Sequence, residues 1–227
     1  MAAMLRVALL ADIHANLPAL DAVLADVPEV DHICCLGDIV GYYPDCNQVC
    51  AKVRALGASV IRGNHDAYVI GALEPAPERE AAYRTEWTRQ TLEPSHLHWL
   101  GGLPATATLR FGDLTLTLRH ANPWDEESYL YPDSPLLDRL QLDTGAILAV
   151  GHTHRPMTRR IGHGLLVNPG SVGQPRDWSP LASYALLDLP SCDVSIRRVA
   201  YDVPAYQGRL AAEGLLQSSI DILGRTR

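Results

Sequence analysis

The sequence predicts an α/β domain that contains two β-sheets. Three strand-like apolar runs occur within the first 62 residues and alternate with helix-like segments, which indicates a parallel sheet with helices packed on it. After Pro104, apolar and polar residues alternate, which is typical of further strands. The chain has 227 residues, and no linker rich in proline or glycine divides it. We therefore expect a single domain over residues 1–227.

The order of strands and helices begins near the N-terminus. Residues 5–11 are an apolar run of strand length. Asn16-Leu17-Pro18 marks a helix start, because asparagine caps helices and proline fits their first turn. Apolar side chains at helical spacing follow it. The next expected elements are a strand at 32–36, a helix at 47–56 and a strand at 58–62.

Residues 72–101 interrupt this order with a polar, helix-rich segment that has prolines at its entry. The segment is either a cap over a site or a solvated helical excursion. Beyond it, residues 106–111 and 114–119 alternate on either side of Gly112-Asp113, which predicts a β-hairpin. Later elements are expected as strands at 146–150, 165–167, 181–187 and 194–199, a closing helix at 205–216 and a loosely structured tail at 216–227.

Composition and charge narrow the function classes. The formal net charge of −7 argues against non-specific nucleic-acid binding, because a polyanion would meet a negative protein without a basic stripe. No apolar segment of 18 residues and no signal-peptide pattern occur, so we expect no membrane span and a cytoplasmic location. The five cysteines include no C-x-x-C pair. They are either small buried residues in a reducing compartment or, less simply, metal or redox groups.

Polar side chains follow the strand-like runs at five places. Because loops at the carboxyl ends of parallel strands meet in one crevice, we expect these segments to converge. They are Asp12-Ile13-His14, Gly37-Asp38, Asn64-His65-Asp66, His120 and His152-Thr153-His154. In the last of them, alternate residues of an extended segment would point the same way and present two imidazoles together.

The side chains of these segments suit a pair of metal ions. Apart from His65 and Asp66, two carboxylates, four imidazoles and one amide oxygen offer oxygen and nitrogen donors without thiolate, a set suited to Mn, Fe, Zn or a similar divalent ion. The set is too large for one four-coordinate ion, and Asp38 is the natural carboxylate to place one oxygen on each of two ions. Each segment alone has a plainer explanation, with Asp12 an acid at a helix start, Gly37-Asp38 a turn and His120 a structural histidine.

The order of the motifs is more specific than any one of them. D-x-H, G-D, G-N-H-D, H and G-H-T-H occur in this order between residues 12 and 154, and the arrangement resembles the calcineurin-like metallophosphoesterases. The resemblance implies a four-layer αββα sandwich of two mixed β-sheets with flanking helices, and a centre of two divalent metal ions with manganese favoured. The segments G-D-I-V-G-Y-Y-P-D and N-P-G-S-V-G-Q-P-R-D also resemble a bacterial and archaeal branch of small phosphoesterases of mostly unassigned substrate.

The resemblance also assigns roles to residues. A hydroxide between the ions would be the nucleophile. His65 would contact the phosphate and protonate the leaving oxygen. Asp66 would orient His65, or would instead be a surface or helix-capping aspartate. The implied metal ligands are Asp12, His14 and His154 for one ion, Asn64, His120 and His152 for the other, and Asp38 as the bridge.

The substrate contacts are less defined. Arg176 either binds a substrate phosphate or ties its own loop to a carbonyl or carboxylate. Tyr42 and Tyr43 either line the substrate pocket or cover the edge of the core. The related protein phosphatases have an acid and an arginine where this chain has Gly41 and Tyr42, which weakens any assignment as a phosphoprotein phosphatase.

The leading hypothesis is a metal-dependent phosphoesterase that hydrolyses a small phosphomonoester or phosphodiester, nucleotides included. The alternatives are a catalytically silent scaffold on the same fold and a nucleotide-sensing module. A homodimer is a further expectation, through an apolar face of residues 72–101 or of the β-hairpin.

Overall fold

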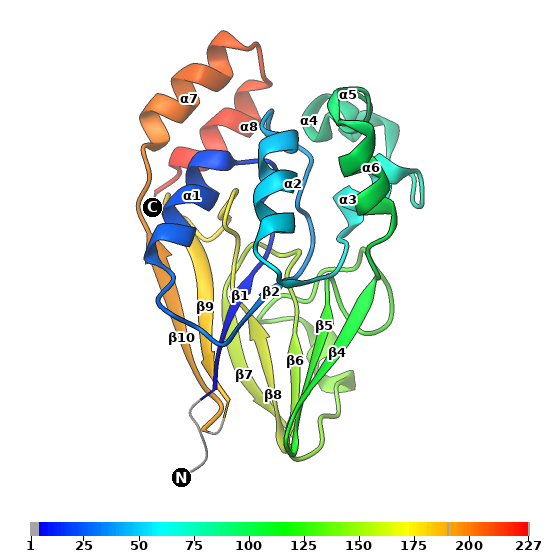
Figure 1. Cartoon of the computed structure of the whole chain (residues 1–227), viewed down its shortest axis with the longest axis vertical. Coiled ribbons are helices and arrows are strands. Elements are labelled where there is room, and N and C mark those ends of the chain that lie inside the picture. The colour runs from blue at the N-terminus through cyan, green and yellow to red at the C-terminus, as the bar shows by residue number, and fades with distance from the viewer. Residues whose placement is uncertain (1–4, 190, 227) are drawn as a thin grey trace.

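Two five-stranded sheets form the centre of the protein (Figure 1). The computed structural model describes residues 5–189 and 191–226. The first sheet has the order β10-β9-β1-β2-β3, in which β1, β2 and β3 are parallel and β9 is antiparallel to both of its neighbours. Its strands are β1 (Arg6–Leu10), β2 (His32–Cys35), β3 (Ser59–Val60), β9 (Ala182–Asp188) and β10 (Asp193–Val199).

The second sheet is mixed as well. Its order is β4-β5-β6-β8-β7, in which β5, β6 and β8 are parallel and the two edge strands are antiparallel to their neighbours. The predicted hairpin is β4–β5, and Phe111 pairs with Leu114 at its turn. The strands are β4 (Thr106–Phe111), β5 (Leu114–Arg119), β6 (Ala146–Ala149), β7 (Met157–Ile161) and β8 (Gly164–Asn168).

Strand residues alternate between the core that joins the two sheets and the outer faces. In β1, Val7 and Leu9 lie in the core between the sheets, whereas Ala8 and Leu10 lie in the core under the helices. This is the period of two that a strand buried on both faces requires. Strands β6 and β8 alternate in the same way.

The helices cover the outer face of the first sheet. The first begins at Asn16, whose side chain accepts a hydrogen bond from the N–H of Ala19 at 3.1 Å, as its sequence predicts. In Figure 1 the helices gather over the upper half of the molecule, and the β4–β5 turn lies at the lower end. They are α1 (Leu17–Asp26), α2 (Cys46–Ala55), α3 (Asn64–Ile70), α4 (Glu80–Tyr83), α5 (Thr85–Thr91), α6 (Pro94–Gly101), α7 (Val203–Ala212) and α8 (Gln217–Asp221).

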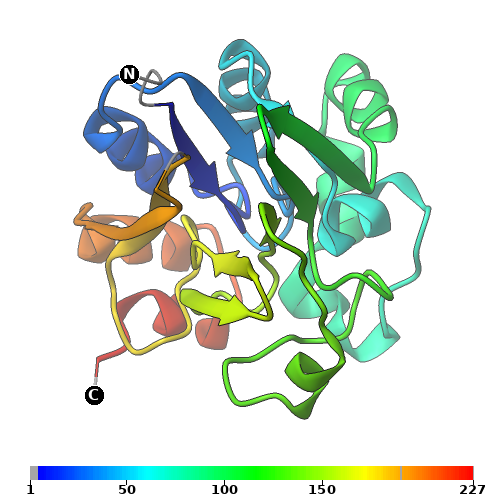
Figure 2. The same ribbon diagram turned by 90° about the horizontal axis from the view of Figure 1, so that it is seen from below.

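The outer face of the second sheet is covered by residues 121–145. This segment contains the 3₁₀ helix η2 (Pro135–Arg139) and lies beside the yellow-green strands in Figure 2. Leu130, Leu137 and Leu140 pack there on the outward side chains of β6, β7 and β8. The fourth layer of the sandwich is therefore a loop with one short helical turn, while the two mixed sheets are confirmed.

Three segments differ from the sequence-based expectation. Helix α3 begins within G-N-H-D and was not predicted from the sequence, and neither was β7, which reads M-T-R-R-I with no apolar alternation. The tail expected to be loose at 216–227 instead contains α8 and the 3₁₀ helix η3 (Ile222–Gly224). The reason is that Ile220 and Leu223 are buried in the core that the helices share. Residue 227 lies outside the described residues.

Residues 72–101 form the 3₁₀ helix η1 (Pro77–Arg79) and helices α4, α5 and α6. Helices α5 and α6 pack against α2 and α3. All five cysteines are free, and four of them are buried. Among the described residues, no helix combines the length and apolar character needed to cross a bilayer.

Candidate metal centre

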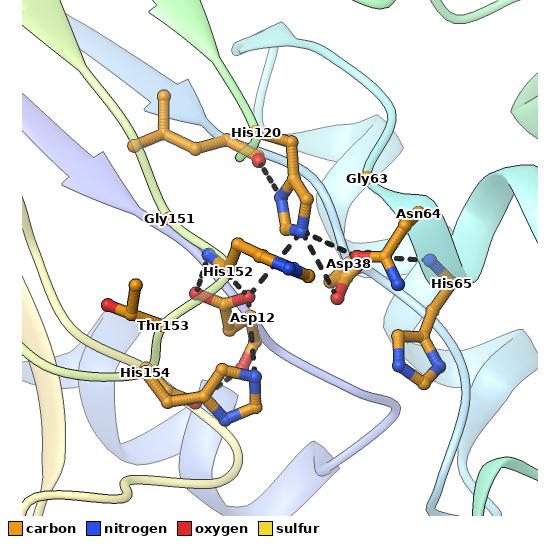
Figure 3. A network of polar contacts seen from close by, with 12 residues as sticks. Asp12, Asp38, Gly63, Asn64, His65, His120, Gly151, His152, Thr153 and His154 are labelled. Atoms are coloured by element: carbon orange, nitrogen blue, oxygen red, sulfur yellow. Dashed lines mark hydrogen bonds and ion pairs between the residues drawn. The ribbon is translucent and has the colours of Figure 1, made fainter. Parts of the chain in front are cut away.

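Seven polar side chains converge beyond the carboxyl ends of β1, β2, β3, β5 and β6, and Figure 3 labels all of them except His14. Each belongs to a loop that directly follows its strand, or to the start of the helix after it, which is the arrangement the sequence predicts. None is more than 5% exposed. The seven are Asp12, His14, Asp38, Asn64, His120, His152 and His154.

The backbone at these positions is strained. Five of the seven have positive φ, a region that costs a non-glycine residue about 1–2 kcal/mol. Such strain persists only where the surrounding structure enforces it, as it does at functional sites. The five are Asp12 (54°), His14 (50°), Asp38 (53°), His152 (64°) and His154 (57°). The loops therefore aim side chains at a common point at a cost in stability.

Two overlapping groups of donors share Asp38. The first contains Asp12, His14, Asp38 and His154. His14 Nε2 lies 3.0 Å from His154 Nε2 and 3.5 Å from Asp38 Oδ2, and His154 Nε2 lies 3.5 Å from Asp12 Oδ1. Such a cluster of nitrogen and oxygen donors has the composition of a divalent cation site.

The second group contains Asp38, His120 and His152. His120 Nε2 lies 3.3 Å from Asp38 Oδ2 and 3.0 Å from the side-chain oxygen of Asn64. Asp38 is thus the carboxylate common to both groups, in the position of a bridge.

Backbone carbonyls fix which nitrogen of each imidazole faces the site. His14, His120 and His154 place Nδ1 at 3.3, 2.7 and 2.6 Å from the carbonyl oxygens of Val40, Leu36 and Gln174. A carbonyl can only accept, so each Nδ1 carries a proton and each ring turns Nε2 into the site, where Nε2 has a free lone pair when the ring is neutral. The ring of His152 is reversed, because its Nε2 lies 2.7 Å from the carbonyl of Glu127.

In these tautomers, hydrogen-bond acceptors of different side chains face one another without a donor between them. The lone pairs of His14 Nε2 and His154 Nε2 meet at 3.0 Å, which is unfavourable unless a cation or a proton lies between them. Asp38 Oδ2 is buried and has no hydrogen-bond partner among the described residues, while Oδ1 accepts from the N–H of His65 at 2.9 Å. An unpartnered buried carboxylate oxygen between two imidazoles fits a bridging metal ligand.

The charges of the protein groups follow from their burial. Burial lowers the pKa of His152 to about 3 and holds those of His14 and His154 well below the usual range, so these rings are neutral. Burial also acts to lower the pKa of His120, but Asp38 and Asp12 outweigh it and raise the pKa to about 10. Burial, with the like charge of Asp38, raises the pKa of Asp12 to about 7 against the attraction of His120.

The G-H-T-H loop corrects one step of the sequence argument. His152 and His154 do not lie on an extended segment and do not present their rings together, because both residues have positive φ. His154 enters the first group and His152 the second. The expectation that an extended segment presents the two imidazoles together is therefore wrong for this loop, while the division of the two histidines between the groups is the one that the resemblance implies.

His65 lies beside both groups in a cage of rings. Its ring centroid is 4.9 Å from that of His14, 4.8 Å from Tyr42 and 4.3 Å from Tyr83. Gly41 has a φ of 90°, and a Cβ there would lie 2.8 Å from His65 Nδ1. Aromatic packing thus holds His65 in place, and Gly41, which stands where the related protein phosphatases have an acid, leaves room for its ring. Burial lowers the pKa of His65 to about 4.

Among the described residues, the side chain of Asp66 binds backbone N–H groups and not the ring of His65. Its Oδ1 accepts from the N–H groups of Ile39 and Val40 at 3.0 and 3.1 Å, and its Oδ2 accepts from the N–H of Gly63 at 2.9 Å. Asp66 is fully buried and closes the first turn of α3, so of its predicted roles the helix cap holds and the surface position does not. It ties the loop after Asp38 to the helix that carries Asn64.

Replacing Asp66 with asparagine is expected to destabilise the fold. The amide keeps one acceptor but turns an N–H₂ group toward backbone donors, so about 2–3 kcal/mol of unfolding free energy should be lost. Urea unfolding measures the change. Asp138→Asn, at an exposed aspartate on η2, is the matched control and should change it by less than about 0.5 kcal/mol. An unchanged midpoint for Asp66→Asn would contradict the role of Asp66 as a tie between the loops.

The predicted substrate residues lie at one side of the centre. The Tyr42 hydroxyl accepts from Arg176 Nη2 at 3.0 Å, and its ring centroid lies 4.8 Å from His14. Arg176 also donates to the side-chain oxygen of Gln174 at 2.6 Å, so it ties its own loop while facing the centre. Tyr43 is fully buried and donates to the carbonyl of Ser219, which favours the core-edge interpretation for this tyrosine.

Sequence reasoning missed several residues of the site. Tyr83 comes from the 72–101 segment and packs on His65, and Tyr129 stacks on His152 with ring centroids 4.2 Å apart. Glu127 accepts from the hydroxyl of Tyr68 and supplies the carbonyl that orients His152. No local pattern marks these residues, because only the folding of distant loops brings them to the centre.

The family of the chain can be read from comparisons with known proteins. The calcineurin-like phosphoesterase superfamily domain matches residues 5–191. The chain belongs to this superfamily. Like other calcineurin-like phosphoesterases it is a hydrolase of phosphoester bonds, and the divalent metals that the superfamily uses have two candidate groups of ligands here.

Three similar proteins span most of this calcineurin-like phosphoesterase. A metallophosphoesterase crystal structure from Sphaerobacter thermophilus superposes with a TM-score of 0.80 at 33% identity, covering 98% of this chain and 99% of that one. An uncharacterized protein of Methanocaldococcus jannaschii is 34% identical over 218 residues, or 87% of this chain and 88% of its own. Phosphodiesterase YfcE of Escherichia coli K12 is 27% identical over 204 residues, or 82% and 88%.

Divalent metal is expected to stabilise this phosphoesterase in a pH-dependent way. At a free concentration 100 times Kd, each ion adds about 2.7 kcal/mol, which raises Tm by roughly 5–10 °C at this chain length. His120 is protonated below about pH 10 and Asp12 below about pH 7, so metal that binds these side chains must displace their protons in those pH ranges. The shift in Tm should therefore be larger at pH 8 than at pH 6, measured with Mn²⁺ against EDTA. Equal shifts at the two pH values would contradict the release of protons from His120 and Asp12 on metal binding.

Proposed function

We propose that this chain hydrolyses a small phosphomonoester or phosphodiester, nucleotides included, at a dinuclear metal centre with His65 as the general acid. The observation that carries the proposal is Asp38 Oδ2, which is buried, unpartnered among the described residues and flanked by imidazoles of both donor groups at 3.3 and 3.5 Å. One carboxylate shared by two sets of donors is suited to two ions rather than one.

The chain's own residues would divide the work. Two bound divalent ions would supply Lewis-acid polarisation of the phosphate and a nucleophile from water near neutral pH. The ligands proposed to hold them are Asp12, His14 and His154 on one side and Asn64, His120 and His152 on the other. Asp38 keeps the two sides in register, because its Oδ1 is also fixed by the N–H of His65.

His65 would deliver a proton to the leaving oxygen. Its backbone is tied to Asp38 and its ring is confined by Tyr42 and Tyr83, so the imidazole has few alternative positions. The negative charge of a bound phosphate would raise the low pKa of His65, so that the ring binds its proton when substrate is present. Arg176 and Tyr42 stand at the same side and would contact the phosphate oxygens.

A metal-reconstituted screen tests the proposal. Protein purified without chelator and supplied with Mn²⁺ is assayed on p-nitrophenyl phosphate, bis(p-nitrophenyl) phosphate and nucleotides, while bound metal is counted. We expect two equivalents of metal and turnover that EDTA abolishes. Fewer than one equivalent after Mn²⁺ addition would favour the scaffold interpretation, and two equivalents without turnover would favour a sensing module.

A further inference from the structure

A cavity of about 260 Å³ lies beside the metal centre, and two residues at the side of that centre line it. Tyr42 and Arg176 form part of its wall, and the ring of Tyr42 also packs on His14 and His65. A molecule held at the metal centre would therefore have this cavity as a neighbouring space. The volume is below the roughly 300–1,000 Å³ of sites that enclose a whole drug-sized ligand, so it suits one part of a substrate.

The lining of this cavity is strongly cationic. Three arginines line it, namely Arg79, Arg176 and Arg225, and none of its lining residues is an aspartate or a glutamate. This contrasts with the chain as a whole, whose net charge is −7. A local positive field on a negative protein indicates an anionic ligand.

Two of these arginines, Arg79 and Arg225, make no side-chain hydrogen bond or ion pair with the described residues. Both residues are exposed. Arg176 differs, because it donates to Gln174 and Tyr42. The free pair thus has its forked donors available for a phosphate.

The rest of the wall suits a phosphate ester. Tyr83 and Tyr129 add aromatic surface, and Ser218 adds a hydroxyl on an exposed stretch of α8. These groups come from the 72–101 segment, the loop after β5 and the C-terminal helix, which lie far apart in sequence. Both the helical segment and the tail therefore contribute to one wall beside the metal centre.

We propose that this cavity binds a second phosphate group of the substrate, one that is not cleaved. The substrate class is then a compound with at least two phosphate groups, such as a nucleoside diphosphate or a dinucleoside polyphosphate. This inference rests on the proposed function for the position of the cleaved phosphate. The tyrosines would contact the organic part that the two phosphates carry.

The test compares AMP with ADP, at a fixed free Mn²⁺ concentration. Binding to the metal-loaded protein is measured by calorimetry, and hydrolysis by phosphate release. We expect ADP to bind at least tenfold more tightly than AMP. The double variant Arg79→Gln/Arg225→Gln should lose about tenfold or more of the ADP affinity and bring it close to that of AMP. Arg160→Gln, an exposed arginine on β7 outside the cavity, is the matched control and should keep the wild-type ratio.

The outcomes separate the two proposals. Equal affinities of the wild type for AMP and ADP, or an ADP affinity that the double variant leaves unchanged, would overturn the second phosphate site whether or not the protein hydrolyses esters. Arginine-dependent binding of ADP without turnover of any ester would refute the proposed hydrolysis while supporting the anion site.

Discussion

Asp38→Asn is expected to lower kcat/KM by at least about 10³, equivalent to roughly 4 kcal/mol of transition-state stabilisation. The amide can still accept the N–H of His65 through Oδ1, but an N–H₂ group then replaces the oxygen that lies 3.3 Å from His120 and 3.5 Å from His14. An N–H₂ group has no lone pair to share between two ions. Metal content should fall below two equivalents, and phosphate release from bis(p-nitrophenyl) phosphate measures the loss.

The fold should survive this substitution. Asparagine has nearly the volume of aspartate, so the packing of the site is kept. The unfolding free energy in EDTA should fall, because Asp38 raises the pKa of His120 and the buried imidazolium would lose this partner. Asp138→Asn should match the wild type in activity. Full activity of Asp38→Asn with Mn²⁺ supplied would refute the bridging role.

The positions of the predicted ligands could be read from the sequence because each follows its strand within a few residues. Asp12 and Asp38 come two and three residues after the ends of β1 and β2, and the parallel order of these strands brings both to one edge of the sheet. The direction of each side chain is a different matter. Positive φ at His152 and His154 separates two imidazoles that an extended chain would have paired.

Two helices that are stabilised by contacts with distant residues could not be predicted from the sequence. Helix α3 starts in a G-N-H-D stretch that favours a loop locally, but Asp66 accepts backbone hydrogen bonds from Gly63 and from the loop after Asp38. The C-terminal helix is short and largely polar, and the burial of Ile220 against the helical core decides its structure. Tertiary contacts override weak local propensity in both cases.

One residue of the 72–101 segment, Tyr83, connects this segment to the metal centre. Tyr83 is the tyrosine of A-A-Y-R, a stretch that reads as an ordinary polar helix. Its carbonyl accepts from the N–H of Tyr42 at 2.9 Å, and its ring packs on His65. These contacts favour the interpretation of the 72–101 segment as a cap over the site.

His65→Ala is expected to lower kcat by about 10² to 10⁴ on esters with a poor leaving group, such as an alkyl phosphate. The effect should be much smaller with p-nitrophenyl phosphate, because p-nitrophenolate leaves without a proton. Metal content should stay near two equivalents, since the metal ligands are unchanged. The ratio of activities on the two substrates, measured for wild type and variant, reports the proton donor separately from the packing of the site.

The role of His65 as a general acid predicts on which side of the pH profile kcat falls. A general acid acts in its protonated form, so its contribution is present below the pKa of His65 in the substrate complex and is lost as pH rises through it. Burial lowers that pKa to about 4 in the protein alone, and the charge of bound phosphate must raise it for the acid to work near neutrality. Wild-type kcat on the alkyl ester should therefore decline on the alkaline side, and His65→Ala should lack this limb. A variant that keeps the limb, or that loses equal activity on both esters, would show that His65 acts only through packing.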